Sequence, residues 1–169
     1  AGYYQRFVPS YSTVAAPLYR LLHKDVEFEW SEECGGSFEE LKRRLTTAPL
    51  LRYPDFKRPF VLDTDASDVG LGAVLQQVAE DEEEYVVAYA SRSLKPAERN
   101  YTVTERECLA VVWAMVYFRP YLFGTHFLVR TDHSALRWLM DLKGKKELPQ
   151  RIERWFLTLS EFEFTIEFR

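Results

Sequence analysis

The sequence is poor in cysteine, has no surplus of positive charge and contains no long apolar run. Its two cysteines, Cys34 and Cys108, lie far apart in helix-like segments, so a disulfide framework is not expected. We expect both to be structural thiols of a protein in a reducing compartment. With no apolar run of membrane-spanning length and no signal-peptide pattern, we expect no membrane partner. The net charge of −4 is low for a nucleic-acid-binding protein, although a local basic face is compatible with it.

What is present fits a globular α/β protein. The 169 residues are enough for one domain and an appendage, and the absence of an initiator methionine suggests a piece of a longer chain. Residues 52–59 contain two prolines and several charges, which predict a connector, and we place a domain boundary there. The predicted units are a helical segment over residues 1–58 and an α/β domain over residues 59–169.

The first unit is predicted to hold short helices, since its apolar residues recur near helical spacing and prolines 9 and 17 interrupt them. A second helix is expected to start at Ser37, because Ser37 and Glu40 form a capping-box pattern, and to end before Pro49. The glycines at 35 and 36 disfavour an earlier start.

In the second unit the apolar period changes to two, which predicts strands. Three consecutive strands are expected to form an antiparallel meander: Phe60–Asp65, Gly70–Gln77 and Tyr85–Ser91. The elements expected next are a long helix from about Pro96 or Tyr101 to Phe118, a strand over Phe127–Thr131, and helices over Ser134–Met140 and Leu148–Ser160. Apolar and polar residues alternate over residues 162–168, which predicts a half-buried edge strand at the end of the chain. The order of strands and helices then predicts a five-stranded mixed sheet with flanking helices.

Three acids are candidate metal ligands. Asp65 ends an apolar strand and is followed by small residues, a setting that suits a hard divalent cation with oxygen ligands. Asp63 shares its face of the strand, but Asp65 is nearer the open end and is therefore preferred. On the long helix Glu107 lies on the same stripe as Ala110, whereas Glu105 points elsewhere. Asp132 follows the fourth strand directly.

Each acid also has a structural interpretation that the residues alone leave open. Glu107 could be a helix N-terminal acid favoured by the helix dipole. Asp132 could cap the helix that follows it, and Asp65 could close a turn. The order of the three acids along one predicted sheet edge favours a shared site.

At these acids the chain resembles the ribonuclease H region of reverse transcriptases from gypsy-class long-terminal-repeat retrotransposons. The residues that carry the resemblance are Thr64-Asp65-Ala66-Ser67 with Gly70-Leu71-Gly72, Thr104-Glu105-Arg106-Glu107-Cys108, and Val129-Arg130-Thr131-Asp132-His133. Segments such as Phe28-Glu29-Trp30 look like the connection that joins a polymerase to its ribonuclease H domain. The polymerase's own paired-aspartate motif is absent from this chain.

The resemblance implies a ribonuclease H-like fold and an endonuclease that hydrolyses the RNA strand of RNA–DNA hybrids. Asp65, Glu107 and Asp132 would then bind two Mg²⁺ ions, or Mn²⁺ in their place. Ala66, Ser67 and His133 would contact the substrate, with the backbone near the first two reading the 2′-hydroxyl. The implied partners are the hybrid and the rest of the reverse transcriptase polyprotein, within a cytoplasmic virus-like particle.

The family's fourth acid would lie past Arg169, so the resemblance also implies that the isolated fragment is weakly active or inactive. The alternatives are a non-catalytic connection domain or domesticated relic that binds nucleic acid or a protein, and a metal-free interaction module. The three acids favour the nuclease, and the missing fourth acid favours the relic.

Overall fold

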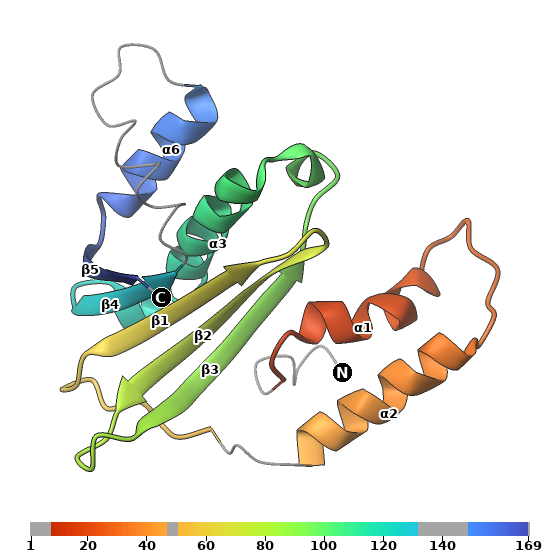
Figure 1. Ribbon diagram of the computed structural model, residues 1–169, viewed down its shortest axis with the longest axis horizontal. Coiled ribbons are helices and arrows are strands. Elements are labelled where there is room, and N and C mark those ends of the chain that lie inside the picture. The colour runs from red at the N-terminus through yellow and green to blue at the C-terminus, as the bar shows by residue number, and fades with distance from the viewer. Residues whose placement is uncertain (1–7, 47–50, 132–148, 169) are drawn as a thin grey trace.

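The computed structural model describes residues 8–46, 51–131 and 149–168. A five-stranded sheet forms its centre, with α3 (Val103–Tyr117) against one face, and the helices α1 and α2 beside the β3 side of the sheet (Figure 1). The strand order is β3-β2-β1-β4-β5. This mixed sheet with flanking helices confirms the predicted fold class, while the division of the chain at residues 58 and 59 stays a prediction.

The helical segment contains α1 (Tyr11–Arg20) and α2 (Glu32–Thr46). They pack on each other around a small core of Val8, Tyr11, Ala15 and Leu41, separate from the main core. Ser12 at the start of α1 donates its N–H to the Ser91 hydroxyl on β3 at 2.9 Å, which joins the segment to the sheet. The segment therefore has its own core and also contacts the sheet.

The predicted start of α2 at Ser37 is wrong, because the helix begins at Glu32 and runs through both glycines. Ser31 caps it instead: its hydroxyl accepts the Cys34 N–H at 3.3 Å, and its carbonyl accepts the Gly35 N–H. Glu40, assigned by the sequence to a capping box, pairs with Arg43 and Arg44 one turn later. Two acids in the first turn also suit the helix dipole.

The first three strands form the predicted meander. They are β1 (Phe60–Ala66), β2 (Gly70–Val78) and β3 (Glu84–Ser93), with both pairings antiparallel. Gly70 is required where β2 meets β3, since a Cβ there would lie 2.9 Å from the carbonyl oxygen of Arg92. The main core lies between this sheet and α3, and the alternating burial of β2 follows the alternating sequence.

The remaining elements complete a parallel half of the sheet. After α3 come α4 (Arg119–Leu122), β4 (His126–Thr131), α6 (Gln150–Leu159) and β5 (Glu163–Phe168), and a 3₁₀ turn, η2 (Glu98–Asn100), precedes α3. β4 pairs in parallel with β1 and with β5, so β5 is an edge strand as predicted. The helix expected over Ser134–Met140 lies outside the described residues.

Both cysteines are buried and neither forms a disulfide, which confirms the prediction of structural thiols. Across the described ranges, no helix is long and apolar enough to cross a membrane.

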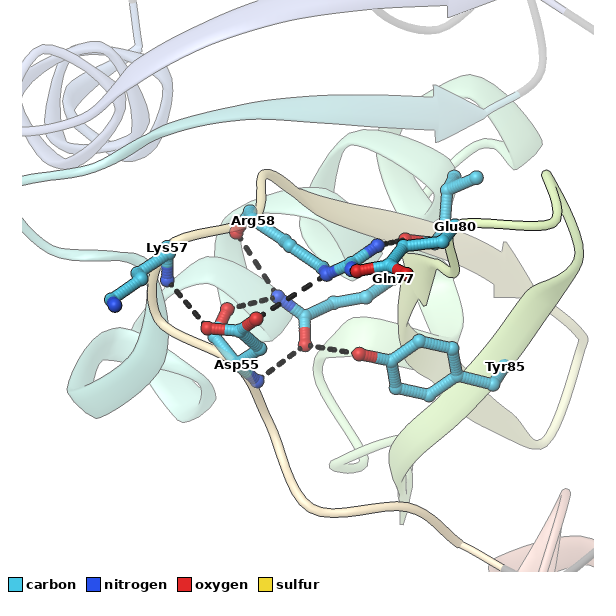
Figure 2. Close-up of polar contacts among 7 residues, drawn as sticks. Asp55, Lys57, Arg58, Gln77, Glu80 and Tyr85 are labelled. Atoms are coloured by element: carbon cyan, nitrogen blue, oxygen red, sulfur yellow. Dashed lines mark hydrogen bonds and ion pairs between the residues drawn. The ribbon is translucent and has the colours of Figure 1, made fainter.

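The connector (residues 52–59) is held to the sheet by Gln77, a fully buried residue of β2. Its amide oxygen accepts the N–H of Asp55 at 2.9 Å and the Tyr85 hydroxyl at 3.1 Å. Its amide nitrogen donates to the carbonyls of Asp55 and Arg58 at 2.8 and 3.0 Å, and Figure 2 shows the side chain between connector and sheet. Arg58 adds ion pairs to Asp55 and Glu80. The connector is thus fixed to β2 rather than loosely attached.

Candidate active site

Asp65 lies near the end of β1 with its side chain exposed. Its antiparallel partner on β2 is Gly72, which presents no side chain beside it. A Cβ on Gly72 would be 3.9 Å from the Asp65 carbonyl oxygen, an ordinary contact, so the glycine is not forced by space. The pairing leaves the Asp65 carboxylate open to a ligand.

Asp63 shares the Asp65 face of β1 but has a different environment. It is partly buried and accepts a hydrogen bond from the Gln76 amide on β2. The strand therefore separates a carboxylate that is bonded within the sheet from one that is exposed, as the position of Asp65 nearer the strand end suggested.

The turn after Asp65 is closed by Ser67. Its N–H donates to the Gly70 carbonyl at 2.9 Å, and its hydroxyl accepts the Gly70 N–H at 3.0 Å. The hydroxyl also donates to that carbonyl at 3.1 Å. These bonds fix the turn, and they occupy the Ser67 groups that the sequence assigned to substrate contact.

The first turn of α3 is joined to this same turn. Arg106 donates from its guanidinium to the Asp68 carboxylate at 2.5 Å, although the two residues are 38 positions apart in sequence. The Arg106 side chain is only 12% exposed, so part of the pair is shielded from water. The contact places the residue next to Glu107 against the turn that follows Asp65.

Glu107 and Glu105 have separate environments on α3. Thr102 and Glu105 form a reciprocal capping box at the helix start, and Glu105 also pairs with Arg151 of α6. Glu107 is buried, at 9% exposure, near the start of the sheet-facing stripe that continues through Ala110 and Ala114. Burial, with smaller contributions from Glu107 and Glu105, raises the pKa of the neighbouring Cys108 thiol to about 12.

The third expected acid falls at the end of β4. Thr131 is the last residue of that strand, and Asp132 and His133 follow it in sequence but lie outside the described residues. β4 runs parallel to β1, with Arg130 paired to Asp63, so both strands end at the same edge of the sheet. Among the residues that the structure describes, no group of three or more His, Cys, Asp or Glu side chains could hold a metal ion.

A cavity of about 340 Å³ opens at this sheet edge. The cavity is lined by strand residues and by the start of α1: Pro9, Ser10, Asp63, Thr64, Asp65, Gly72, Ala73, Val74, Tyr89, Arg130 and Thr131. Arg130 contributes a positive charge to the cavity lining and forms ion pairs with Glu84 and Glu167 at 2.6 Å each. Burial lowers the Arg130 pKa, but the bonds to Glu167 and Glu84 outweigh it and raise the pKa above its ordinary value.

Sequence reasoning missed two hydroxyls at this edge. Thr64 and Thr131 both line the cavity, and the side-chain oxygen of each is buried without a hydrogen-bond partner. The signal was present in the sequence, because a threonine precedes the acid in both Thr64-Asp65 and Thr131-Asp132.

Comparison with known proteins identifies the family. The model of the RNase H-like domain found in reverse transcriptase matches residues 55–162. The chain belongs to this family. The match begins within the connector at Asp55, one of the residues that Gln77 binds.

Curated relatives extend the likeness to nearly the whole chain. The Pol polyprotein from transposon 297 of Drosophila melanogaster is 42% identical over 168 residues, and the transposon Tf2-3 polyprotein of Schizosaccharomyces pombe is 37% identical over 170. Each match covers 99% of this chain but only 15% and 13% of the polyproteins. The resemblance to gypsy-class retrotransposon polyproteins is thereby confirmed.

Solved structures share the fold. The foamy viral protease-reverse transcriptase in complex with double-stranded DNA superposes with a TM-score of 0.79 at 22% identity, over 99% of this chain and 36% of that one. The foamy viral protease-reverse transcriptase in complex with an RNA/DNA hybrid superposes with a TM-score of 0.73 at 22% identity, over 99% of this chain and 23% of that one.

Proposed function

We propose that this domain is a metal-dependent endonuclease that hydrolyses the RNA strand of RNA–DNA hybrids. The observation that carries the proposal is the ion pair between Arg106 and Asp68. Arg106 precedes Glu107 on α3 and Asp68 lies in the turn after Asp65, so the pair brings these two parts of the chain together. Asp132 follows directly on the strand that ends beside β1. Membership of the family supports the same reaction class.

The donors at this edge fit Mg²⁺. Carboxylate oxygens are the ligands that Mg²⁺ prefers, and it retains several waters that need polar neighbours. Asp65 offers an exposed carboxylate at the end of β1, beside a glycine on the neighbouring strand. Asp65, Glu107 and Asp132 would hold two Mg²⁺ ions, or Mn²⁺. When bound, the ions would activate a water and stabilise the leaving 3′-oxygen.

The protein's own part is to position the ligands and the substrate. The paired strands fix the backbone at Asp65, and the capped first turn of α3 fixes Glu107. Backbone groups near Ala66 and Ser67, with His133, would meet the hybrid, and the turn bonds of Ser67 leave Ala66 as the better candidate for reading a 2′-hydroxyl. The viral reverse transcriptase solved with an RNA/DNA hybrid supports this class of substrate.

The domain would act within a reverse transcriptase polyprotein. Residues 1–58 would form the connection to the polymerase, and residues 59–169 the nuclease. The chain spans about a seventh of its curated relatives, so DNA synthesis and the other polyprotein activities would belong to the parent.

The test is cleavage of a labelled RNA–DNA hybrid with Mg²⁺, using this chain and a version extended past Arg169 to include the expected fourth acid. We expect products with a 5′-phosphate and a 3′-hydroxyl, cut only in the RNA strand. Asp65→Asn and Glu107→Gln should each lose cleavage, whereas Glu105→Gln should retain it, since Glu105 caps α3 and pairs with Arg151.

Equal cleavage by the extended wild type and Asp65→Asn would refute the mechanism. No cleavage by any version, with the hybrid still bound, would favour the non-catalytic connection domain or relic. Cleavage of single-stranded RNA at the same rate would leave a nuclease but overturn the hybrid specificity.

A further inference from the structure

Gly72 of β2 is a glycine that the fold itself does not require. Glycine inside a strand is destabilising, because it contributes no packing and loses more backbone freedom on folding than any other residue. It is found there where the backbone bulges, where φ is left-handed, or where other atoms approach closely. The φ of Gly72 is not left-handed, and the register shift between β2 and β3 lies further along, at Leu75 and Gln76.

Packing within the protein does not require this glycine either. Among the described residues, a Cβ on Gly72 would come within 4 Å of one atom, the Asp65 carbonyl oxygen, at an ordinary 3.9 Å. Gly70 on the same strand is different, since a Cβ there would lie 2.9 Å from the carbonyl oxygen of Arg92. The protein's own backbone therefore explains Gly70 but not Gly72. The explanation left for Gly72 is the close approach of a ligand.

The position without a side chain lies beside Asp65. Gly72 pairs with Asp65 on β1 and with Ser91 on β3, and directly paired residues share one face of a sheet. The Ser91 hydroxyl is already occupied, because it accepts the Ser12 N–H of α1 at 2.9 Å. This row across three strands therefore has α1 at one end, the exposed Asp65 at the other, and an open position between them.

The cavity of about 340 Å³ includes this open position. Gly72 and Asp65 both line it, and Pro9 and Ser10 line it from the start of α1. Its volume is within the range of about 300–1,000 Å³ that is usual for clefts that bind small ligands. A side chain at position 72 would take up part of this space.

We propose that Gly72 is a substrate-contact residue of the nuclease, and that the space over it receives the sugar–phosphate backbone of the RNA strand next to the cleaved bond. The inference rests on the proposed function. A cation held by Asp65 would contact the cleaved phosphate, and the strand that carries Gly72 lies only about 4.8 Å from β1. The RNA backbone on one side of that phosphate then passes over Gly72, where a side chain would obstruct it.

The experiment compares Gly72→Ala and Gly72→Val with wild type. Binding of a fluorescent RNA–DNA hybrid is measured by anisotropy in EDTA, and Mn²⁺ affinity by electron paramagnetic resonance. Melting temperatures are also measured, and kcat/KM is determined with Mg²⁺ in the version extended past Arg169. Gly36→Ala is the matched control, because a Cβ on Gly36 also meets open space but lies on the exposed surface of α2.

We expect Gly72→Val to lower kcat/KM about 100-fold, because displacing the reacting groups by about 1 Å can cost that much. Hybrid affinity in EDTA should fall in the order glycine, alanine, valine. Mn²⁺ affinity should stay at the wild-type value. Both variants should melt at or above the wild-type temperature, since alanine and valine suit a strand better than glycine. Gly36→Ala should bind and cleave as wild type does.

Wild-type binding and cleavage by Gly72→Val would overturn the inference. A lowered melting temperature in Gly72→Ala would also overturn it, because the fold itself would then need the glycine. Weaker Mn²⁺ binding by both variants would do the same, since the side chain would then act on the cation and not on the RNA.

The failure of the proposed function gives a different result. If the extended wild type does not cleave the hybrid, the proposed function fails and the inference falls with it. If the extended wild type cleaves, Asp65→Asn does not, and Gly72→Val cleaves normally, the nuclease stands and only the role of Gly72 is wrong.

Discussion

Replacing Gln77 by leucine should destabilise the protein more than its position at the end of a strand suggests. The change keeps the approximate volume of a fully buried side chain but removes four hydrogen bonds to the connector and Tyr85. Each such bond is worth about 0.5–1.5 kcal/mol net, and water can reach some of the exposed connector groups. We therefore expect a loss of about 2–4 kcal/mol.

Tyr85→Phe is the matched control, since it removes only one of the four bonds and should cost about 1 kcal/mol. Urea unfolding gives both free energies, and limited trypsin digestion reports the connector locally. Gln77→Leu should expose the peptide bonds after Arg52, Lys57 and Arg58 to cleavage much faster than Tyr85→Phe. If Gln77→Leu unfolds within about 0.5 kcal/mol of wild type, the connector is not held in the way described.

Three further predictions concern packing and ionisation. Gly70→Ala should cost about 1–3 kcal/mol by urea unfolding, because its Cβ would press on the carbonyl oxygen of Arg92. Gly72→Ala should be near neutral, because its Cβ would make only an ordinary contact, and equal losses of stability in the two variants would contradict this. Burial raises the pKa of Glu98, but bonds from Arg92 and the Lys95 N–H outweigh it and lower the pKa below 4.5. The Glu98 stabilisation is therefore present above pH 4.5 and lost as the pH falls through the folded value, so Glu98→Gln should show a smaller loss of melting temperature between pH 7 and pH 3. Cys108 should resist alkylation at pH 8 until the protein unfolds, because burial and the neighbouring acids keep it a thiol; prompt labelling of the native protein would contradict the burial.

The sheet could be predicted because its signal is local. The meander, the mixed character of the sheet and the edge position of β5 followed from alternation and from the order of elements, and the strand bounds differ by one or two residues. The start of α2 could not be predicted in the same way. Two glycines opposed the longer helix, yet the Ser31 cap and the burial of Cys34 and Leu41 outweighed their intrinsic cost.

For the candidate site, the sequence could predict which face of its strand or helix each acid occupies. The face argument set Asp65 apart from Asp63, and Glu107 apart from Glu105, and the structure gives these residues the corresponding environments. Their metal-binding roles remain predictions. The contacts that build the edge were not predictable, because Arg106 and Asp68 meet across 38 residues and the buried threonine hydroxyls depend on the parallel pairing of two distant strands.

The central claim is that Asp65, Glu107 and Asp132 share one cation site. Anomalous diffraction from crystals of this chain soaked in Mn²⁺ tests it most directly. The account predicts a manganese peak at the ends of β1 and β4, within about 2.0–2.3 Å of carboxylate oxygens from all three acids, that disappears in Asp65→Asn. A peak elsewhere on the surface, or a peak at that edge that survives Asp65→Asn, would contradict it.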